Sequence, residues 1–247
     1  MFVPLLLLLA ATPVTAPPAD PATGAELIQQ MHARYAGRWY RTLTFVQKTT
    51  HPDGSVETWY EAAAIPGSLR IDIAPLSARN ELLFRADSIY RYADGELKMG
   101  RPLVHSLLLL GFDVYGQPPE RTIASLTALG YDLTKVHADT WQGRKVWVVG
   151  ASAGDTVTKQ FWIDQERLVF VRGLAPHPQK PGVHTEVQFN KYVELGQGWI
   201  ETEVLFLEDG TITTREEYRD MRADPTPPVD PVIFLPGAYV APGWVTE

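Results

Sequence analysis

The 247-residue sequence contains no cysteine. Disulfide bonds, thiolate metal ligands and thiol catalysis are therefore excluded. No cysteine is present to carry a lipid anchor, so we expect that the chain is not itself a lipoprotein. Basic residues are few and unclustered, and the formal net charge is −7, which excludes the basic footprint of a nucleic-acid-binding protein. The fold must therefore depend on its hydrophobic core, which a chain of this length can supply.

Catalytic signatures are also missing. The sequence has no Gly-x-Ser-x-Gly elbow, phosphate-binding loop, dinucleotide fingerprint or His-Glu-x-x-His motif. His184 and Glu186 would share one face of a strand, with His177 nearby, but a metal site needs three converging ligands. We expect no metal, no cofactor and no enzymatic activity. An enzyme built around His184 and Glu186 is a third alternative, after the two given below.

Two carboxylate pairs were considered as possible acid and base groups. They are Asp164 with Glu166 and Glu216 with Glu217, and each lies near an expected turn or strand end. We expect both pairs to be solvated surface charges.

The first residues resemble an export signal. Residues 2–11 form an apolar run that is too short to span a bilayer, and small residues follow at Ala16 and Ala19. No basic residue precedes the run, which departs from the usual pattern. We expect a signal peptide over residues 1–19, with cleavage after Ala16 or Ala19. The mature chain is then a soluble, unlipidated protein of the bacterial periplasm, and we expect it to be a monomer.

Alternating apolar and polar residues dominate the rest of the chain. Between residues 41 and 100, short alternating segments are joined by turns that include Asp53-Gly54 and Asp94-Gly95, and Asp-Gly between such segments is a strong hairpin signal. The alternation returns between residues 132 and 219. Further candidate strands are 132–138, 144–149, 156–163, 168–174, 185–193, 199–207 and 211–219.

Helical spacing occurs in two places. Leu27, Ile28, Met31 and Tyr35 predict an amphipathic helix over residues 22–38, with Thr23 as its cap. In the middle of the chain, residues 106–112 are apolar on all sides, so a helix there should be buried all round, and a second helix is predicted over 119–129.

These elements predict a mainly β protein of the α+β class. We expect one large, curved antiparallel sheet of about 11 strands, an unclosed half barrel with helices over its concave face. The predicted domain covers residues 20–224. Residues 225–247 contain six prolines and should form an extended tail packed against the body.

The apolar face of the sheet is the candidate working surface. Charged neighbours such as Glu57, Glu61, Arg70 and Asp72 should take the other side of their strands. The helices could fill the concave side as an ordinary core, or residues 106–112 could cover a cavity for an apolar ligand, and the pattern leaves both open. The candidate ligand-binding residues are Tyr60, Leu69, Ile71, Phe84, Tyr90, Tyr92, Leu107, Leu108, Val148 and Phe161.

Several short motifs occur in a familiar order. A helix leads into Phe45-Val46-Gln47-Lys48, a strand ends at a turn with Pro66, and residues 82–95 end in an aromatic strand and a turn. Lys159-Gln160-Phe161 opens a later strand, and Val229-Asp230-Pro231-Val232-Ile233-Phe234 is followed by Pro236. In this order and these motifs the chain resembles the bacterial lipoprotein carriers, the LolA/LolB-like family.

The resemblance implies an unclosed antiparallel barrel whose helices form a lid over an apolar cavity. Members of the family hold the acyl chains of lipoproteins in transit to the outer membrane. The implied partners are lipoprotein or lipid acyl chains and membrane-associated donor and acceptor proteins. One position departs from the family, because the arginine that precedes the turn proline and helps to latch the lid is Ile65 here.

The sequence therefore predicts a periplasmic carrier or chaperone that binds lipoprotein acyl chains or another apolar ligand. The alternative is a non-catalytic interaction or regulatory module of the cell envelope, with a filled core.

Overall fold

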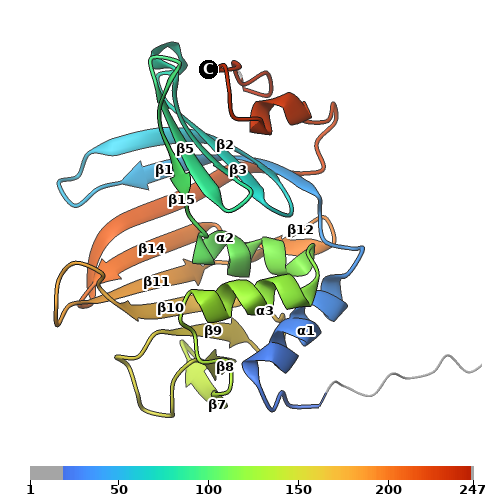
Figure 1. The fold of residues 1–247 in the computed structure, drawn as a ribbon, viewed down its shortest axis with the longest axis vertical. Helices are drawn as coiled ribbons and strands as arrows, with labels where there is room; N and C mark the ends of the chain where they lie inside the picture. Colours follow the sequence, from blue (N-terminus) through green and yellow to red (C-terminus); the bar gives the residue numbers. More distant parts are fainter. Residues whose placement is uncertain (1–18, 246–247) are drawn as a thin grey trace, which may run out of the picture.

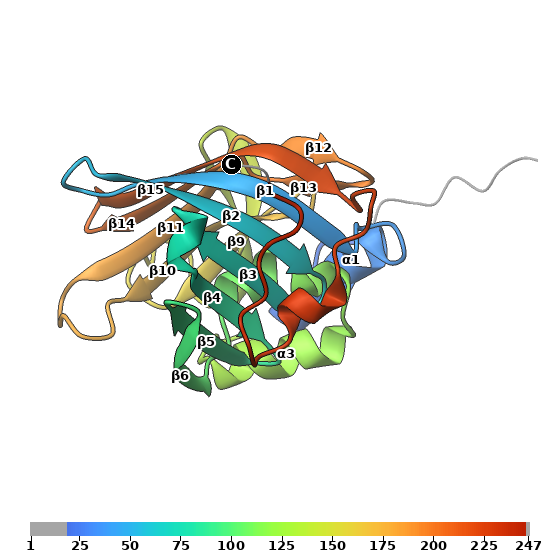
Figure 2. The same ribbon diagram turned by 90° about the horizontal axis from the view of Figure 1, so that it is seen from above.

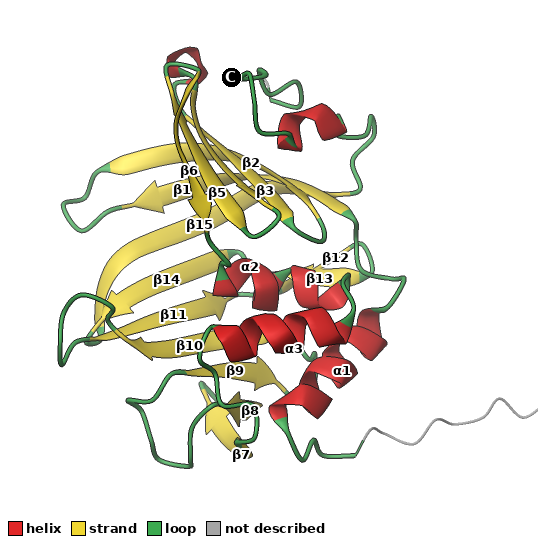
Figure 3. Ribbon diagram, in the orientation of Figure 1, coloured by secondary structure: helices red, strands yellow, loops and turns green. Residues whose placement is uncertain are grey.

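The computed structural model describes residues 19–245, so all of the predicted signal peptide except its last residue lies outside the described residues. The structure is built on a single open antiparallel sheet of 13 strands (Figures 1 and 3). The predicted fold class is confirmed, with 13 strands in place of about 11. The strands of the sheet are β1 (Thr42–Thr50), β2 (Val56–Ala64), β3 (Ser68–Ile73), β4 (Asn80–Arg85), β5 (Ser88–Ala93), β6 (Glu96–Pro102), β7 (Val136–Trp141), β8 (Arg144–Val149), β9 (Gln160–Asp164), β10 (Phe170–Pro176), β11 (His184–Asn190), β14 (Glu203–Glu208) and β15 (Thr211–Ala223).

Two expected strands are each divided in the structure. The candidate at 185–193 becomes β11 and β12 (Val193–Leu195), and the candidate at 199–207 becomes β13 (Gly198–Ile200) and β14. Lys191 adopts a left-handed backbone conformation with φ of 55°, which ends β11. β12 and β13 then pair with each other as a separate two-stranded ribbon.

The strand order shows how the sheet is assembled. It runs β6-β5-β4-β3-β2-β1-β15-β14-β11-β10-β9-β8-β7, so almost every strand lies beside its neighbour in sequence. The central pair, β1 and β15, joins the first strand of the chain to the last one. At Asp94-Gly95 both φ angles are positive, 55° and 76°, as the Asp-Gly hairpin signal predicts.

Three α-helices lie on the concave side of the sheet: α1 (Gly24–Tyr35), α2 (Ser106–Gly111) and α3 (Pro119–Ala128) (Figure 1). Thr23 caps α1, with its Oγ1 accepting a hydrogen bond of 3.1 Å from the Glu26 amide. The buried face of α1 carries Leu27, Ile28 and Met31, as its spacing predicted. Within residues 19–245, no helix is long and apolar enough to cross a membrane.

Residues 225–245, here called the tail, fold back over the outer side of the sheet, opposite the helices (Figure 2). A short 3-10 turn, η3 (Pro231–Phe234), places Ile233 and Phe234 against Ala62 and Leu83 of the sheet. Both faces of strands β2 to β4 are therefore covered, one by the helices and the other by the tail.

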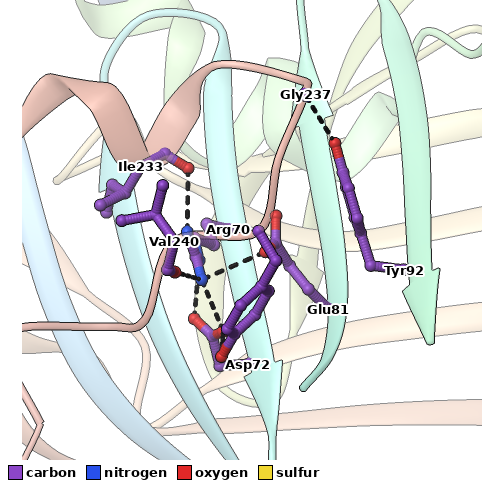
Figure 4. Close-up of polar contacts among 8 residues, drawn as sticks. Arg70, Asp72, Glu81, Tyr92, Ile233, Gly237 and Val240 are labelled. Atoms are coloured by element: carbon purple, nitrogen blue, oxygen red, sulfur yellow. Dashed lines mark hydrogen bonds and ion pairs between the residues drawn. The ribbon is translucent and has the colours of Figure 1, made fainter. Parts of the chain in front are cut away.

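The tail also covers a buried ion network (Figure 4). Arg70 binds Asp72 through two hydrogen bonds, Nε to Oδ2 at 2.7 Å and Nη2 to Oδ1 at 2.8 Å, and its Nη2 lies 3.1 Å from Glu81 Oε2. The guanidinium also donates to the carbonyl oxygens of Ile233 and Val240 in the tail. Arg70 and Asp72 lie opposite the apolar face of β3, as expected, but the tail excludes them from solvent.

Candidate ligand cavity on the concave face

A cavity of about 220 Å³ lies between the concave face of the sheet and α2. Strands from both halves of the sheet form its wall, and α2 with its flanking residues covers it. The lining residues are Phe45, Gln47, Trp59, Glu61, Leu69, Ile71, Leu82, Phe84, His105, Leu107, Leu108, Phe112, Phe189, Glu201, Val204, Phe206, Glu216 and Tyr218.

Most of the wall is apolar because side chains on a strand alternate between the two faces of a sheet. Leu69 and Ile71 of β3 lie opposite Phe84 and Leu82 of β4 in the strand register, so the four side chains form one continuous surface. Phe206 continues the apolar wall on β14. Such a wall favours a ligand with a hydrocarbon portion.

The roof of the cavity is a short helix. α2 has six residues, and His105 at its N-cap position makes no side-chain capping hydrogen bond. Leu109 and Leu110 are buried in the core, whereas Leu107 and Leu108 are only half-buried because they face the cavity. The expectation that this helix is buried on every side is therefore wrong.

A second hollow, of about 380 Å³, lies on the other side of α2. Its lining shares His105, Leu107 and Phe206 with the first cavity. A displacement of α2 would therefore join the two hollows. A six-residue helix without a capping side chain depends on tertiary contacts for its stability, so it is suited to such movement.

Three carboxyl groups, here called the cavity acids, also line the cavity: Glu61 on β2, Glu201 before β14, and Glu216 on β15. Glu61 and Glu201 are 3% and 2% exposed. Three expectations about carboxyl groups are therefore wrong, since Asp164 on β9 is also buried, at 2% exposed, and accepts hydrogen bonds from the Glu166 and Arg167 amides. Glu61 shares the concave face with Trp59, and Glu216 lies inside the long β15, with its half-buried side chain toward the cavity.

Burial strongly perturbs the acidity of these groups. It raises the pKa of Glu201 to about 8, and the charge of Glu216 adds to this effect. Burial also raises the pKa of Glu216 to about 7, against the opposing hydrogen bonds of Tyr218 and Gln47. The pKa of Glu61 lies well above its ordinary value because of burial and the charges of Glu216 and Glu201. The three groups therefore interact with one another.

The cavity acids have few partners. Tyr218 donates a 3.1 Å hydrogen bond to Glu216 Oε2, but Glu61 Oε1 and Glu201 Oε1 are buried without a hydrogen-bond partner. His105 Nδ1 is unpartnered too, and burial lowers the pKa of this histidine. Among the described lining residues there is no lysine or arginine. Unpaired buried polar groups are costly, so an arrangement of this kind points to a missing partner.

The turn after β2 contacts the helical cover. Ile65, the residue before the turn proline, packs its side chain against the main core. Beside it, the Gly67 amide donates a 2.8 Å hydrogen bond to Asp113 Oδ1 in the 3-10 turn η2 (Asp113–Tyr115). Burial raises the pKa of Asp113 to about 6. The same turn is therefore fastened to the cover through Gly67 and Asp113, without an arginine before the proline.

The ten candidate ligand-binding residues fall into three groups. Leu69, Ile71, Phe84, Leu107 and Leu108 line the cavity together. Tyr60, Tyr90 and Tyr92 face the outer side, where the Tyr92 hydroxyl accepts a hydrogen bond from the Gly237 amide of the tail. Val148 and Phe161 are fully buried in the main core. Ligand binding by the first five remains a prediction.

The candidate residues His177, His184 and Glu186 each contact a different partner. Glu186 Oε1 accepts from Arg172 Nε at 2.7 Å, His184 Nδ1 lies 3.6 Å from Asp209, and His177 Nε2 lies 3.5 Å from Glu208. Within residues 19–245, no group of three or more His, Cys, Asp or Glu side chains has the geometry to hold a metal ion.

The cavity acids are the residues of the candidate site that the sequence pattern does not predict. A signal for Glu61 was present, because it lies two positions from Trp59 and from Ala63 on an alternating strand. Gln47 and Thr49 likewise place polar groups at the inward positions of β1. Glu201 has no such signal, since it lies in the break between β13 and β14.

Comparison with known proteins supports the fold. No protein-family model matches the sequence, and no curated protein matches it significantly. Among solved structures, an outer membrane lipoprotein-sorting protein domain from Vibrio parahaemolyticus is 14% identical, with a TM-score of 0.56 over 85% of this chain and 95% of that one. A DUF1329 family protein from Desulfovibrio piger is 13% identical, with a TM-score of 0.55 over 86% and 96%.

A LolA superfamily protein from Nitrosomonas europaea is also similar, at 13% identity and a TM-score of 0.50, over 87% of this chain and 98% of that one. These likenesses define the class of fold: a half-open antiparallel sheet of the LolA-like type. The resemblance to the lipoprotein carriers is thereby confirmed at the level of the fold.

Proposed function

We propose that this protein is a periplasmic carrier or chaperone that holds an acyl chain, or another apolar chain, in the cavity beneath α2. The observation that carries the proposal is the apolar cavity itself, placed between the concave sheet and a short helix. The tail does not fill this space, because it lies on the opposite face of the sheet. The LolA-like fold of its structural neighbours supports the same role.

The cavity has the volume of a closed, unloaded state. An apolar cavity of roughly 150 Å³ can hold benzene, and pockets for larger ligands measure roughly 300–1,000 Å³. About 220 Å³ therefore accepts only part of an acyl chain. Loading a whole chain requires α2 to move, which would open the second hollow as well.

Binding of a neutral fluorescent apolar probe, such as N-phenylnaphthylamine, tests the proposal. The wild-type protein should bind the probe, and Leu108→Trp should weaken binding about tenfold or more, because the indole fills the cavity. Leu97→Trp is the matched control, since Leu97 is 48% exposed and lies on β6 outside the cavity. Absence of probe binding, or equal loss in both variants, would overturn the proposal.

Native mass spectrometry of the protein from a bacterial periplasm gives an independent measurement. We expect co-purified lipid or acylated peptide in the wild-type protein and less of it in Leu108→Trp. The alternative of an interaction module with a filled core predicts neither probe binding nor a bound lipid.

A further inference from the structure

Carboxyl groups dominate the polar part of the cavity. Three of the seven buried side-chain polar atoms without a partner in the described chain line this one cavity, namely Glu61 Oε1, Glu201 Oε1 and His105 Nδ1. The nearby donors are engaged within the chain, because Gln47 Nε2 donates to Thr49 Oγ1 at 2.8 Å and the Gln47 and Tyr218 side chains hydrogen-bond Glu216. Glu61 Oε1 and Glu201 Oε1 have no such partner, so they favour a ligand that brings donors.

The charge of the cavity points in the same direction. Three carboxyl groups face it, no lysine or arginine is among its described lining residues, and burial keeps His105 from acting as a cation. An ionised carboxylate ligand would bring a negative charge into a site where the three carboxyl groups already hinder one another's ionisation, so it would be disfavoured. An ammonium group would bring three N–H donors and neutralise one of the carboxylates.

From this geometry, and building on the function proposed above, we infer that the ligand is a cationic amphiphile. Its hydrocarbon chain would lie on the wall formed by Leu69, Ile71 and Phe84, and its ammonium group would bind the cavity acids. The inference sets this protein apart from a carrier for free fatty acids, whose headgroup carries the opposite charge.

The inference makes binding dependent on pH. Besides the cavity acids themselves, the titratable groups that face the cavity are Tyr218 on β15 and His105 before α2. Tyr40, Tyr115 and Tyr192 lie close enough to Glu201 to interact with its charge. The tyrosines and His105 stay neutral near pH 7, so the carboxyl groups control the response. Their raised pKa values mean that cation affinity should increase from about pH 6 to about pH 9.

A chain-matched set of ligands tests this inference: dodecyltrimethylammonium, dodecylammonium, dodecanol and dodecanoate, each below its micelle concentration. Each ligand competes with the neutral fluorescent probe. Near pH 8 we expect dodecylammonium to bind about tenfold or more tightly than dodecanol, because it brings both charge and N–H donors. Dodecyltrimethylammonium brings the charge alone and should bind more tightly than dodecanol but less tightly than dodecylammonium, and dodecanoate should bind more weakly than dodecanol. Near pH 7, calorimetry in buffers of different ionisation enthalpy should show that the trimethylammonium ligand releases protons, because the cation favours ionised carboxylates.

The double variant Glu201→Gln, Glu216→Gln, which keeps only Glu61 of the three cavity acids, should lose most of the preference for cations while still binding the neutral probe. Glu217→Gln is the matched control, because Glu217 is next to Glu216 but faces outward and is 42% exposed. If the double variant does not fold, the wild-type pH series decides, since only the cation affinities should increase with pH.

The outcomes separate the two proposals. If the protein binds the neutral probe but shows no preference among the ligands, or prefers dodecanoate, the inference fails and the carrier function stands. If the preference is undiminished in the double variant, Glu201 and Glu216 are not its cause and the inference fails. If neither probe nor ligand binds, both proposals fail.

Discussion

Buried carboxyl groups occur on both faces of this sheet, in two different settings. On the outer face, Asp72 and Glu81 lie around Arg70, and the tail supplies two carbonyl oxygens to the same guanidinium. On the concave face, the three cavity acids lie around an empty volume with no cation among the described lining residues. The first cluster is satisfied within the chain, whereas the second is not.

This difference in partners suggests a structural role for the outer cluster and a binding role for the cavity acids. A buried charge paired with an opposite charge links the secondary-structure elements on which the two residues lie. Here Arg70 links β3, β4 and the tail. A buried carboxyl group without a partner reduces stability unless it stays protonated or a ligand supplies the partner. A third case lies between them, because Asp113 has one backbone amide as its partner.

The largest effect is expected from removing the counter-charge on the outer face. Arg70→Met leaves Asp72 and Glu81 buried without a cation, so the free energy of unfolding should decrease by about 3–5 kcal/mol. Both carboxyl groups would then keep their protons to higher pH in the folded state, so the loss should grow from pH 5 to pH 8. Urea denaturation at several pH values measures this.

Lys48→Met is the control for Arg70→Met, because it breaks the exposed ion pair of 3.2 Å with Glu217. This change should cost less than about 1 kcal/mol. Equal losses in the two variants would contradict the structural role of Arg70.

The tail shields the ion network of Arg70, Asp72 and Glu81 from solvent. Phe234 is 3% exposed and packs against Ala62 and Leu83, so Phe234→Ala should destabilise the protein by about 3 kcal/mol. Limited proteolysis should then cut residues 225–245 sooner than in the wild type. The neighbouring Leu235 is 51% exposed, and Leu235→Ala should change neither measurement.

These two clusters also show what the sequence could predict. Alternation correctly placed Arg70 and Asp72 opposite Leu69 and Ile71, because that period is a local property of the strand. It could not predict their burial, which depends on contacts with Ile233 and Val240, 163 and 170 positions away.

For the candidate site too, alternation could not predict burial, and here it led to a wrong expectation. Glu61 and Glu216 were expected in solvent because charged residues of a strand usually face water. Around β2 the helices cover one face of the sheet and the tail covers the other, so a charged side chain on either face can be buried. The half-open sheet and the position of its helical cover could be predicted, since they follow from many weak local signals. The acids in the cavity could not, because they depend on which strands the curvature brings together.

A smaller effect should come from the cavity acids themselves. The pKa of Glu201 is raised to about 8, so the folded protein keeps a proton there that the unfolded chain releases near its ordinary pKa of 4.5. The stability of the wild type should therefore decrease as pH increases from about 5 to about 8 and then level off. At pH 8 this raised pKa corresponds to about 4 kcal/mol, and the unpartnered amide of a buried Gln should offset about half of it, so Glu201→Gln should be more stable than the wild type by roughly 2 kcal/mol.

Thermal unfolding across this pH range measures the effect, with Glu217→Gln as the control that keeps the wild-type slope. A cationic ligand should reproduce the gain without any mutation, because it binds the folded state alone. A wild-type stability that stays level between pH 5 and pH 8 would show that Glu201 is not buried as the structure places it.

The smallest effect is expected at Asp113, whose single partner is the Gly67 amide at 2.8 Å. Asp113→Ala leaves this amide without an acceptor and should cost about 1 kcal/mol, whereas Asp113→Asn keeps an acceptor oxygen and should cost less. The more informative measurement is local, because the bond fastens the turn after β2 to the cover that contains α2. Hydrogen exchange of residues 105–117 should accelerate in the alanine variant and stay near the wild-type rate in the asparagine variant.

If the cover must move to admit a chain, the alanine variant should also bind the neutral probe faster. Faster exchange with unchanged probe kinetics would mean that the ligand enters by another route and that α2 is a fixed wall.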